Sequence, residues 1–284
     1  MTPRVAANPP IMPACRVLAV AAFLLAVFTP SFATAQQRLL PNLSARVEER
    51  VLFVAGNTLF SLHHEIAHAL IHQFDLPVLG REEDAADGYA TLAMQPNPPT
   101  LLADALLLNA ADGWLFYAET APIDQLAYID AHPLDEQRFY RTACLIIGSD
   151  IEGFYEYGLD VGLTEERIEE CPRLWQDTRR DWERLLAPHR HLGSPPTISR
   201  LPVAWHAPPA RLSDEIGFLR SSGLVDDATQ KVSDAYALKR PVAVQLRDCG
   251  EPAAFYDPDP PSITLCYELL IEFVDLFDQA IGVE

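Results

Sequence analysis

The longest regular pattern in the chain is a run of apolar side chains over residues 47–74, VEERVLFVAGNTLFSLHHEIAHALIHQF. The apolar residues recur every three or four positions, which predicts one long α-helix because such residues share a helix face. Gly56 is a weak point inside this helix, and Asp75-Leu76-Pro77 predicts its end. The histidine-rich segment HHEIAH therefore lies on the C-terminal half of a helix.

Most of the remaining chain also shows helical periodicity. Period two appears only near the C-terminus, at residues 242–246, and the stretch CGEPAAFYDPDPPSITLCYELL predicts a hairpin with its second strand at residues 262–266. We therefore expect a mainly α (α+β) fold with a small β-hairpin near the C-terminus. Further helices are expected at residues 82–94, 100–119, 134–147, 164–186, 211–238 and 267–281.

The first 35 residues have the pattern of a secretory signal peptide. Arg4 and Arg16 supply positive charge, residues 17–28 form an apolar run, and Ala33-Thr34-Ala35 is a cleavage pattern of small residues. The apolar run is too short to span a bilayer comfortably. A periplasmic or secreted protein is expected, and a membrane-anchored protein with an uncleaved N-terminal segment is the alternative.

The chain after the signal divides into two expected lobes. Residues 36–187 form a helical lobe with the histidine-rich segment, and residues 188–209 are a proline-rich connection of low periodicity. Residues 210–284 then form a C-terminal lobe of helix, hairpin and helix that packs on the first.

Cysteine usage agrees with export. Cys15 falls inside the signal, which leaves an even number of cysteines, as expected for a chain with two disulfides. Three pairings are possible, and local spacing favours Cys144 with Cys171 and Cys249 with Cys266.

The charge balance excludes one broad class of function. The 284 residues carry 21 basic and 40 acidic side chains, a formal net charge of -19, and 49% of them are hydrophobic. A globular protein with this charge repels the phosphates of nucleic acids. We expect no nucleic-acid partner, and no stable membrane insertion once the signal is cleaved.

His64, Glu65 and His68 form the pattern HExxH. Two histidines four residues apart on a helix project from the same face, so both imidazoles can bind one Zn²⁺ ion. Glu65 lies beside the metal rather than on it, where a carboxylate can take a proton from a metal-activated water. His63 and His72 are expected to be structural, since neither shares this position on the helix.

A catalytic zinc needs a third protein ligand, and the next expected helix offers one in Glu83. Asp87 is one turn further on and can accept the free N–H of a ligand histidine. Glu82 is an alternative third ligand if the helix starts at a different residue. We therefore predict His64, His68 and Glu83 as metal ligands, Glu65 as catalytic base and Asp87 as outer-shell partner.

Four segments together resemble a bacterial family of metallopeptidases classed as a domain of unknown function: LFSLHHEIAHALIHQFDLPVLGREEDAADGYATL, CLIIGSDIEGF, EECPRLWQDTRRDWERLLAPH and CGEPAAFYDPDPPSITLCYELL. The resemblance implies a zinc-dependent peptidase of the zincin type. It also implies His64 and His68 as ligands, Glu65 as base and Glu83 as third ligand, and it implies no particular substrate.

The expected function is therefore hydrolysis of peptide bonds by an exported zinc metallopeptidase that acts on peptides or proteins. The alternatives are a non-catalytic envelope binding or chaperone-like protein on the same fold, and a metallohydrolase of non-peptide amides. Tyr256, Tyr267 and His206 are open candidates for stabilising the oxyanion. The strand at residues 262–266 is a candidate for main-chain pairing with a peptide.

Overall fold

The computed structural model describes residues 38–120 and 131–282, except residues 195, 197 and 199. The expected signal peptide with Cys15 lies outside the described residues. The described part is mainly helical with one small sheet, which confirms the predicted α+β class. Its helices are α1 (Ala45–Phe74), α2 (Glu82–Ala93), α3 (Leu101–Thr120), α4 (Asp135–Ser149), α5 (Ile151–Asp160), α6 (Glu165–Leu186), η1 (Ala187–His189), η2 (Ala210–Leu212), α7 (Ser213–Ser222), α8 (Leu224–Ala235) and α9 (Tyr267–Ala280). Its strands are β1 (Val203–Trp205), β2 (Ala243–Arg247), β3 (Ala254–Pro258) and β4 (Pro261–Cys266).

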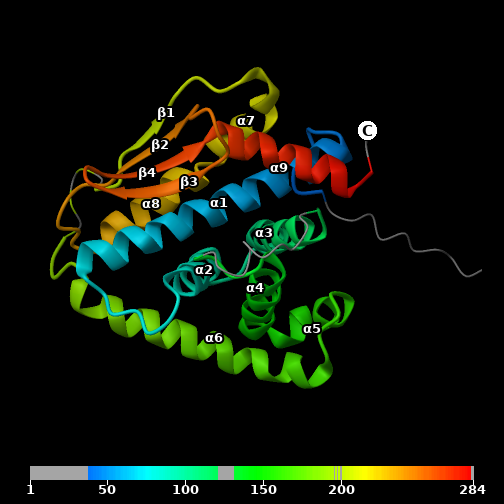
Figure 1. Ribbon diagram of the computed structural model, residues 1–284, viewed down its shortest axis with the longest axis horizontal. Helices are drawn as coiled ribbons and strands as arrows, with labels where there is room; N and C mark the ends of the chain where they lie inside the picture. Colours follow the sequence, from blue (N-terminus) through cyan, green and yellow to red (C-terminus); the bar gives the residue numbers. More distant parts are fainter. Residues whose placement is uncertain (1–37, 121–130, 195, 197, 199, 283–284) are drawn as a thin grey trace, which may run out of the picture. The chain divides into compact units, whose positions relative to one another are not determined.

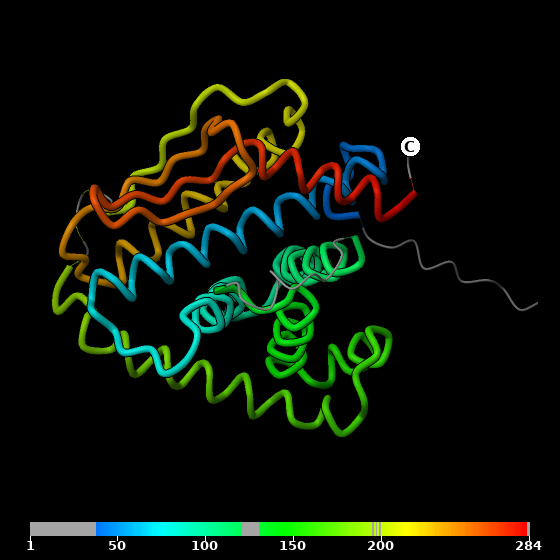
Figure 2. Tube along the Cα trace, viewed as in Figure 1, coloured from blue at the N-terminus to red at the C-terminus, as the bar shows by residue number. Residues whose placement is uncertain are grey.

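The long helix α1 is the central element of the fold. The Ser44 side chain caps its first turn by accepting a hydrogen bond from Val47 N, and Asp75 ends it in the left-handed conformation with φ 55°. Figures 1 and 2 show the sheet on one side of α1 and helices α2 to α6 on the other. Only glycine fits at position 56 of this helix, because a Cβ there would collide with the carbonyl oxygen of Leu106 in α3. The glycine therefore lets α3 pack closely against α1.

The sheet has the strand order β1-β2-β4-β3. β1, β2 and β4 are parallel, and β3 pairs with β4 in the antiparallel direction. The predicted hairpin corresponds to β3 and β4, while the period-two stretch forms β2 on the other side of β4. The three-residue strand β1 was not expected, because it is too short to show an alternation in the sequence.

One predicted helix is wrong in its extent. Residues 211–238 form two helices, α7 and α8, separated by Gly223 with φ 70°. A positive φ interrupts the α-helical backbone, and glycine adopts it without steric cost. The short helix α5 was not expected either. Its start is capped by Asp150, whose side chain accepts a hydrogen bond from Gly153 N.

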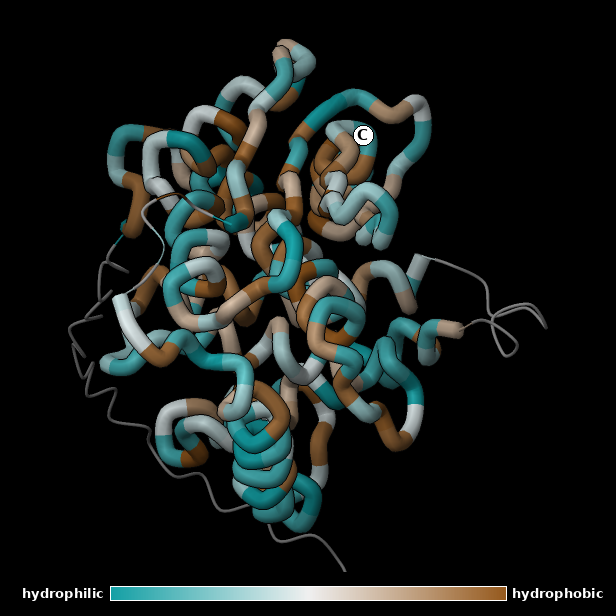
Figure 3. The backbone as a smooth tube through the Cα atoms, turned by 90° about the vertical axis from the view of Figure 1, so that its left-hand side faces the viewer, coloured by the Kyte–Doolittle hydropathy of each residue, from teal (hydrophilic) through white to brown (hydrophobic). Residues whose placement is uncertain are grey.

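Helix α6 forms the outer boundary of the helical side. Its residues are largely hydrophilic where the helix is seen end-on at the bottom of Figure 3. Its inward face is apolar, since Ile168, Cys171, Trp182 and Leu186 are buried. This division is typical of a surface helix that packs one stripe of side chains on the core.

Two disulfides join elements of the fold. Cys144 pairs with Cys171, which ties α4 to α6, and Cys249 pairs with Cys266 at the end of β4. These are the two pairings that local spacing favours. Disulfides of this kind are typical of proteins in an oxidising, extracytoplasmic compartment.

The described helices include none that is both long enough and apolar enough to cross a membrane. The division into two lobes around residues 188–209 stays a prediction. Buried side chains from both sides of this segment belong to one hydrophobic cluster, which includes Phe53 of α1 and Phe277 of α9.

Candidate metal centre

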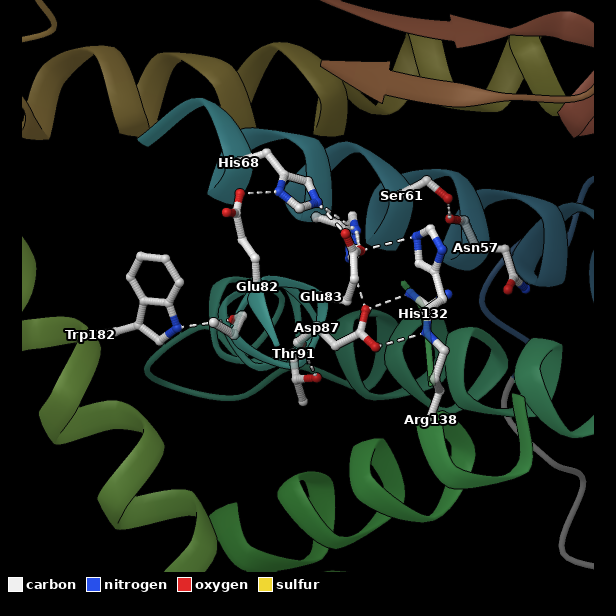
Figure 4. Close-up of polar contacts among 12 residues, drawn as sticks. Asn57, Ser61, His68, Glu82, Glu83, Asp87, Thr91, His132, Arg138 and Trp182 are labelled. Carbon is white, nitrogen blue, oxygen red and sulfur yellow. Dashed lines mark hydrogen bonds and ion pairs between the residues drawn. The ribbon is translucent and has the colours of Figure 1, made fainter. Parts of the chain in front are cut away.

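Helices α1 and α2 bring two imidazoles and one carboxylate together. His64 Nε2 lies 3.0 Å from Glu83 Oε2 and 3.0 Å from His68 Nε2. His68 Nε2 lies 3.5 Å from Glu83 Oε2, and Figure 4 shows the His68 ring on α1 directed at the Glu83 side chain of α2. One potential ligand atom from each of these three side chains lies within 4.8 Å of the others. The structure therefore places the three predicted ligands around one point.

The other ring nitrogen of each histidine meets a second carboxylate. His64 Nδ1 donates to Asp87 Oδ1 at 2.8 Å, and His68 Nδ1 donates to Glu82 Oε1 at 2.7 Å. A carboxylate at Nδ1 keeps the proton on that nitrogen and leaves the Nε2 lone pair available to a metal. Both rings are thereby oriented with Nε2 toward Glu83. Glu82, the alternative third ligand, lies at the outer nitrogen of His68 instead.

Asp87 is itself held by a buried arginine. Arg138 of α4 donates through Nε to Asp87 Oδ2 at 2.8 Å and through Nη2 to Asp87 Oδ1 at 2.6 Å. The guanidinium stacks on the Trp114 ring, 3.5 Å from its centroid. Burial by itself raises the pKa of Asp87, but Arg138 and the hydrogen bond with His64 lower this pKa to about 2. Asp87 therefore stays ionised and fixes the orientation of His64.

The electrostatics of the three ligand candidates suit a bound cation. Burial by itself raises the pKa of Glu83, but its contacts with His132, His64 and His68 hold this pKa far below the ordinary range. Burial by itself lowers the pKa of His68, and hydrogen bonds to Glu83 and Glu82 raise it to about 9. The negative charge that favours a proton on His68 equally favours a metal cation in place of that proton. An ionised carboxylate with two imidazoles is a donor set that fits Zn²⁺.

Glu65 is buried beside this group, next to the sheet. The backbone of Tyr256 in β3 lies close enough to the Glu65 carboxylate to favour its ionised form. Burial is the main cause that raises the pKa of Glu65, and this effect outweighs the nearby imidazoles of His64 and His68. A carboxylate with a raised pKa is a better proton acceptor than an exposed one.

His132 joins the site from the segment between α3 and α4, and sequence reasoning missed it. Its Nε2 lies 3.0 Å from Glu83 Oε2, its ring is stacked with that of His64 at 6.4 Å, and its side chain is 50% exposed. His132 has no fixed spacing from HExxH, so no sequence pattern pointed to it. Arg138 was missed for the same reason, because only the packing of α4 on α2 brings it to Asp87.

A pocket of about 340 Å³ opens beside the candidate ligands. His64, Glu65 and His132 line its polar side, together with Arg138 and Asp135 of α4. The rest of the wall is mostly apolar and comes from α1, α3, β3 and α9. These residues are Phe60, Ser61, Trp114, Tyr117, Ala254, Leu269 and Phe273.

The other candidates from the sequence lie elsewhere. The Tyr256 hydroxyl and Nδ1 of His72 form a hydrogen bond at 3.0 Å, so the two side chains are partners of each other. The Tyr267 hydroxyl donates to the backbone carbonyl of His206 at 2.7 Å. None of the three oxyanion candidates contributes to the pocket lining, whereas His132 does.

Comparison with known proteins identifies a family. A family model described as "Putative metallopeptidase" matches residues 22–186 and 209–282 of the chain. The matched residues include the HExxH segment, Glu83, Asp87, His132 and Arg138. No curated protein and no solved structure matches the chain.

Proposed function

This chain belongs to the family described as "Putative metallopeptidase", and we propose that it is an exported zinc-dependent metallopeptidase that hydrolyses peptide bonds. The family supports the reaction class, and the two disulfides support an oxidising compartment. The choice of zinc, the residue roles and the substrate are part of the proposal.

One observation carries the proposal. His64 and His68 each bind a carboxylate through Nδ1 and direct Nε2 at the carboxylate of Glu83. Such outer partners are typical of histidines that bind metals, because they set the tautomer and the ring orientation. A buried histidine with only a structural role is satisfied by one hydrogen-bond partner at Nδ1. It does not need a second histidine and a further carboxylate at Nε2.

In the proposed mechanism His64, His68 and Glu83 would hold Zn²⁺, which would lower the pKa of a water molecule and polarise the scissile carbonyl. Glu65 takes the proton from the attacking water and returns it to the leaving amine. The raised pKa of Glu65 favours proton uptake. Asp87 and Glu82 keep the two ligand histidines in position.

His132 is our candidate for the oxyanion donor. It lines the same pocket as Glu65 and lies beside Glu83. An imidazole N–H at this place can donate to the carbonyl oxygen as that oxygen gains negative charge. This assignment replaces Tyr256, Tyr267 and His206, whose side chains do not line the pocket.

Strand β3 is the part of the sheet that suits an extended peptide. The expectation that residues 262–266 pair with a substrate is wrong, because β4 lies between β2 and β3 and both of its edges are used. Within the described sheet β3 is the edge strand next to α1, and its Ala254 lines the pocket beside Glu65. A peptide that adds to β3 would pass the candidate metal centre.

The apolar wall of the pocket predicts a side-chain preference. Phe60, Trp114 and Phe273 enclose a volume large enough for one amino-acid side chain but small for a larger ligand. Burial of a large apolar side chain of the substrate in this pocket would stabilise the complex by about 2 kcal/mol. We therefore expect cleavage next to large apolar residues.

A library digest tests the proposed function. The zinc-loaded protein is expected to cleave a peptide library next to large apolar residues, and a chelator that removes the metal is expected to stop cleavage. Products are identified by mass spectrometry, with cell-wall fragments digested in parallel. Cleavage of cell-wall amides alone would identify a metallohydrolase of non-peptide amides, and a protein that binds no zinc at neutral pH would be the non-catalytic alternative.

His132→Gln is expected to lower kcat for a cleaved peptide by about a hundredfold, with little change in KM and with full zinc content. The reason is that an oxyanion donor acts in the transition state and not on the bound substrate. His206→Gln is the matched control, because its side chain does not line the pocket. An unchanged kcat, or a loss of zinc from the His132 variant, would contradict the assignment.

A further inference from the structure

A second and larger cavity lies on another side of α1. Its volume is about 790 Å³, and helices α1, α2, α6 and α8 contribute to its walls. His63 lines this cavity, while its neighbour His64 lines the pocket at the candidate metal centre. The zinc chemistry proposed above uses no residue of the larger cavity. Its volume is within the range of sites for small ligands.

The cavity contains polar groups that lack a protein partner. His63 is only 7% exposed and makes no hydrogen bond with a described residue; its Nδ1 is fully buried. The Gln95 amide is oriented by the Trp175 indole, which donates to Gln95 Oε1 at 2.8 Å. The Nε2 of Gln95 is buried without a partner. Buried polar atoms without partners are costly, so the packing around His63 and Gln95 leaves polar groups of the cavity wall unsatisfied.

One wall of the cavity is an aromatic row on α6. Trp175 and Trp182 both line the cavity, and the Arg179 guanidinium lies over the Trp175 ring at 5.2 Å. The lining residues of this helix extend from Trp175 to Leu186, which is about 16 Å at the rise of an α-helix. An extended peptide of about five residues has the same length.

Acidic groups lie near the Trp175 end of this row. Asp150 follows α4 directly, and Trp175 packs so closely on Gly148 of α4 that a Cβ there would lie 2.8 Å from the Trp175 Cβ. Asp104 of α3 also lines the cavity and is close enough to Asp150 for the two carboxylates to interact. Partial burial and the nearby Asp150 carboxylate both raise the pKa of Asp104. This end is therefore suited to an ammonium group.

Basic groups lie near the other end. Burial lowers the pKa of His63, and Lys231 on α8 is close enough to lower it further. The Arg190 guanidinium lies over the Tyr236 ring at 5.8 Å. Neither cation forms an ion pair with a described residue. Glu183 also lines the cavity, but its carboxylate is bound by Arg179 at 2.7 Å. This end is therefore suited to a carboxylate.

We propose that this cavity binds a short peptide of about five residues with free termini. Its ammonium group lies near Asp104 and Asp150, its carboxylate near Lys231 and Arg190, and its apolar side chains stack on Trp175 and Trp182. The proposal goes beyond the peptidase reaction, because binding is expected whether or not the metal centre is loaded.

The test uses the intrinsic fluorescence of the full chain after metal removal, so that no peptide is cleaved. The probe is the pentapeptide Gly-Ala-Phe-Ala-Gly with free termini, and its comparison is the same peptide acetylated and amidated. The free peptide is expected to change the tryptophan emission in a saturable way, with at least about tenfold higher affinity than the blocked peptide. No saturable change, or equal affinity for the two peptides, would overturn the proposal.

The Lys231→Glu variant tests whether the peptide binds in this cavity and not at another site. We expect at least about tenfold weaker binding of the free peptide, with unchanged binding of the C-terminal amide. Lys239→Glu is the matched control, because this substitution makes the same change of charge at an exposed residue that does not line the cavity. Equal binding by the Lys231 variant and the parent would overturn the proposal, since it would place the peptide elsewhere.

Discussion

Glu65→Gln is expected to bind zinc like the parent chain and to hydrolyse peptides about a thousandfold more slowly. The amide has the same shape as the carboxylate, but it cannot take a proton from water. None of the three candidate ligands is changed, so the metal is expected to stay bound. Metal analysis checks that zinc stays bound, and kcat for one peptide from the library digest checks that turnover is slower.

Glu82→Gln is the matched control for this variant. Glu82 also contacts a ligand histidine, but its side chain is 46% exposed and meets His68 only at Nδ1. It is expected to retain most of the turnover, because the amide oxygen can still accept from Nδ1. Full activity of the Glu65 variant in a purified sample would show that another group takes the proton.

Glu83→Ala is expected to lose zinc. Glu83 is the one anionic member of the three ligand candidates, and its Oε2 is the atom that both Nε2 nitrogens face. Loss of an outer-shell partner typically costs 10–100-fold in metal affinity, so loss of the ligand itself is expected to cost more than about a hundredfold. A competition titration with a chelator measures this affinity.

Glu82→Ala and Asp84→Ala are the controls for the ligand assignment. Glu82 is expected to act as an outer partner of His68, with a loss of at most about a hundredfold, and Asp84 is expected to have no effect. If the Glu83 variant kept its zinc while one of these lost it, the third ligand would be that residue. The circular dichroism spectrum shows in each case whether the helices remain folded.

Much of the helical framework is predictable from the sequence alone. The apolar periodicity of residues 47–74 and the proline after them predicted α1. Thr164 caps the first turn of α6, as expected for a threonine at the start of a helix. Local rules work here because a helix makes its hydrogen bonds within one segment. The break at Gly223 shows their limit, since the apolar pattern continues through residues 211–238 while the backbone turns.

The sheet was less predictable, because its pairing is not local. Alternation and turn residues predicted a hairpin near the C-terminus, but the partner of β4 on its other side is β2, and β1 comes from the proline-rich segment. Because β4 lies inside the sheet, β3 and not β4 is the edge strand that is the candidate for pairing with a substrate. Sequence periodicity shows which residues are half-buried but does not show which strand lies beside another.

The sequence by itself determined the face of α1 that carries His64 and His68, and the turn of α2 that carries Glu83 and Asp87. Helix geometry is enough for this, since residues four apart project together. Only the tertiary structure decided that Glu83 rather than Glu82 faces both Nε2 atoms, that Arg138 holds Asp87, and that His132 joins the site. These contacts join α1, α2, α4 and the segment before α4, and the packing of these elements depends on side chains spread over the whole core.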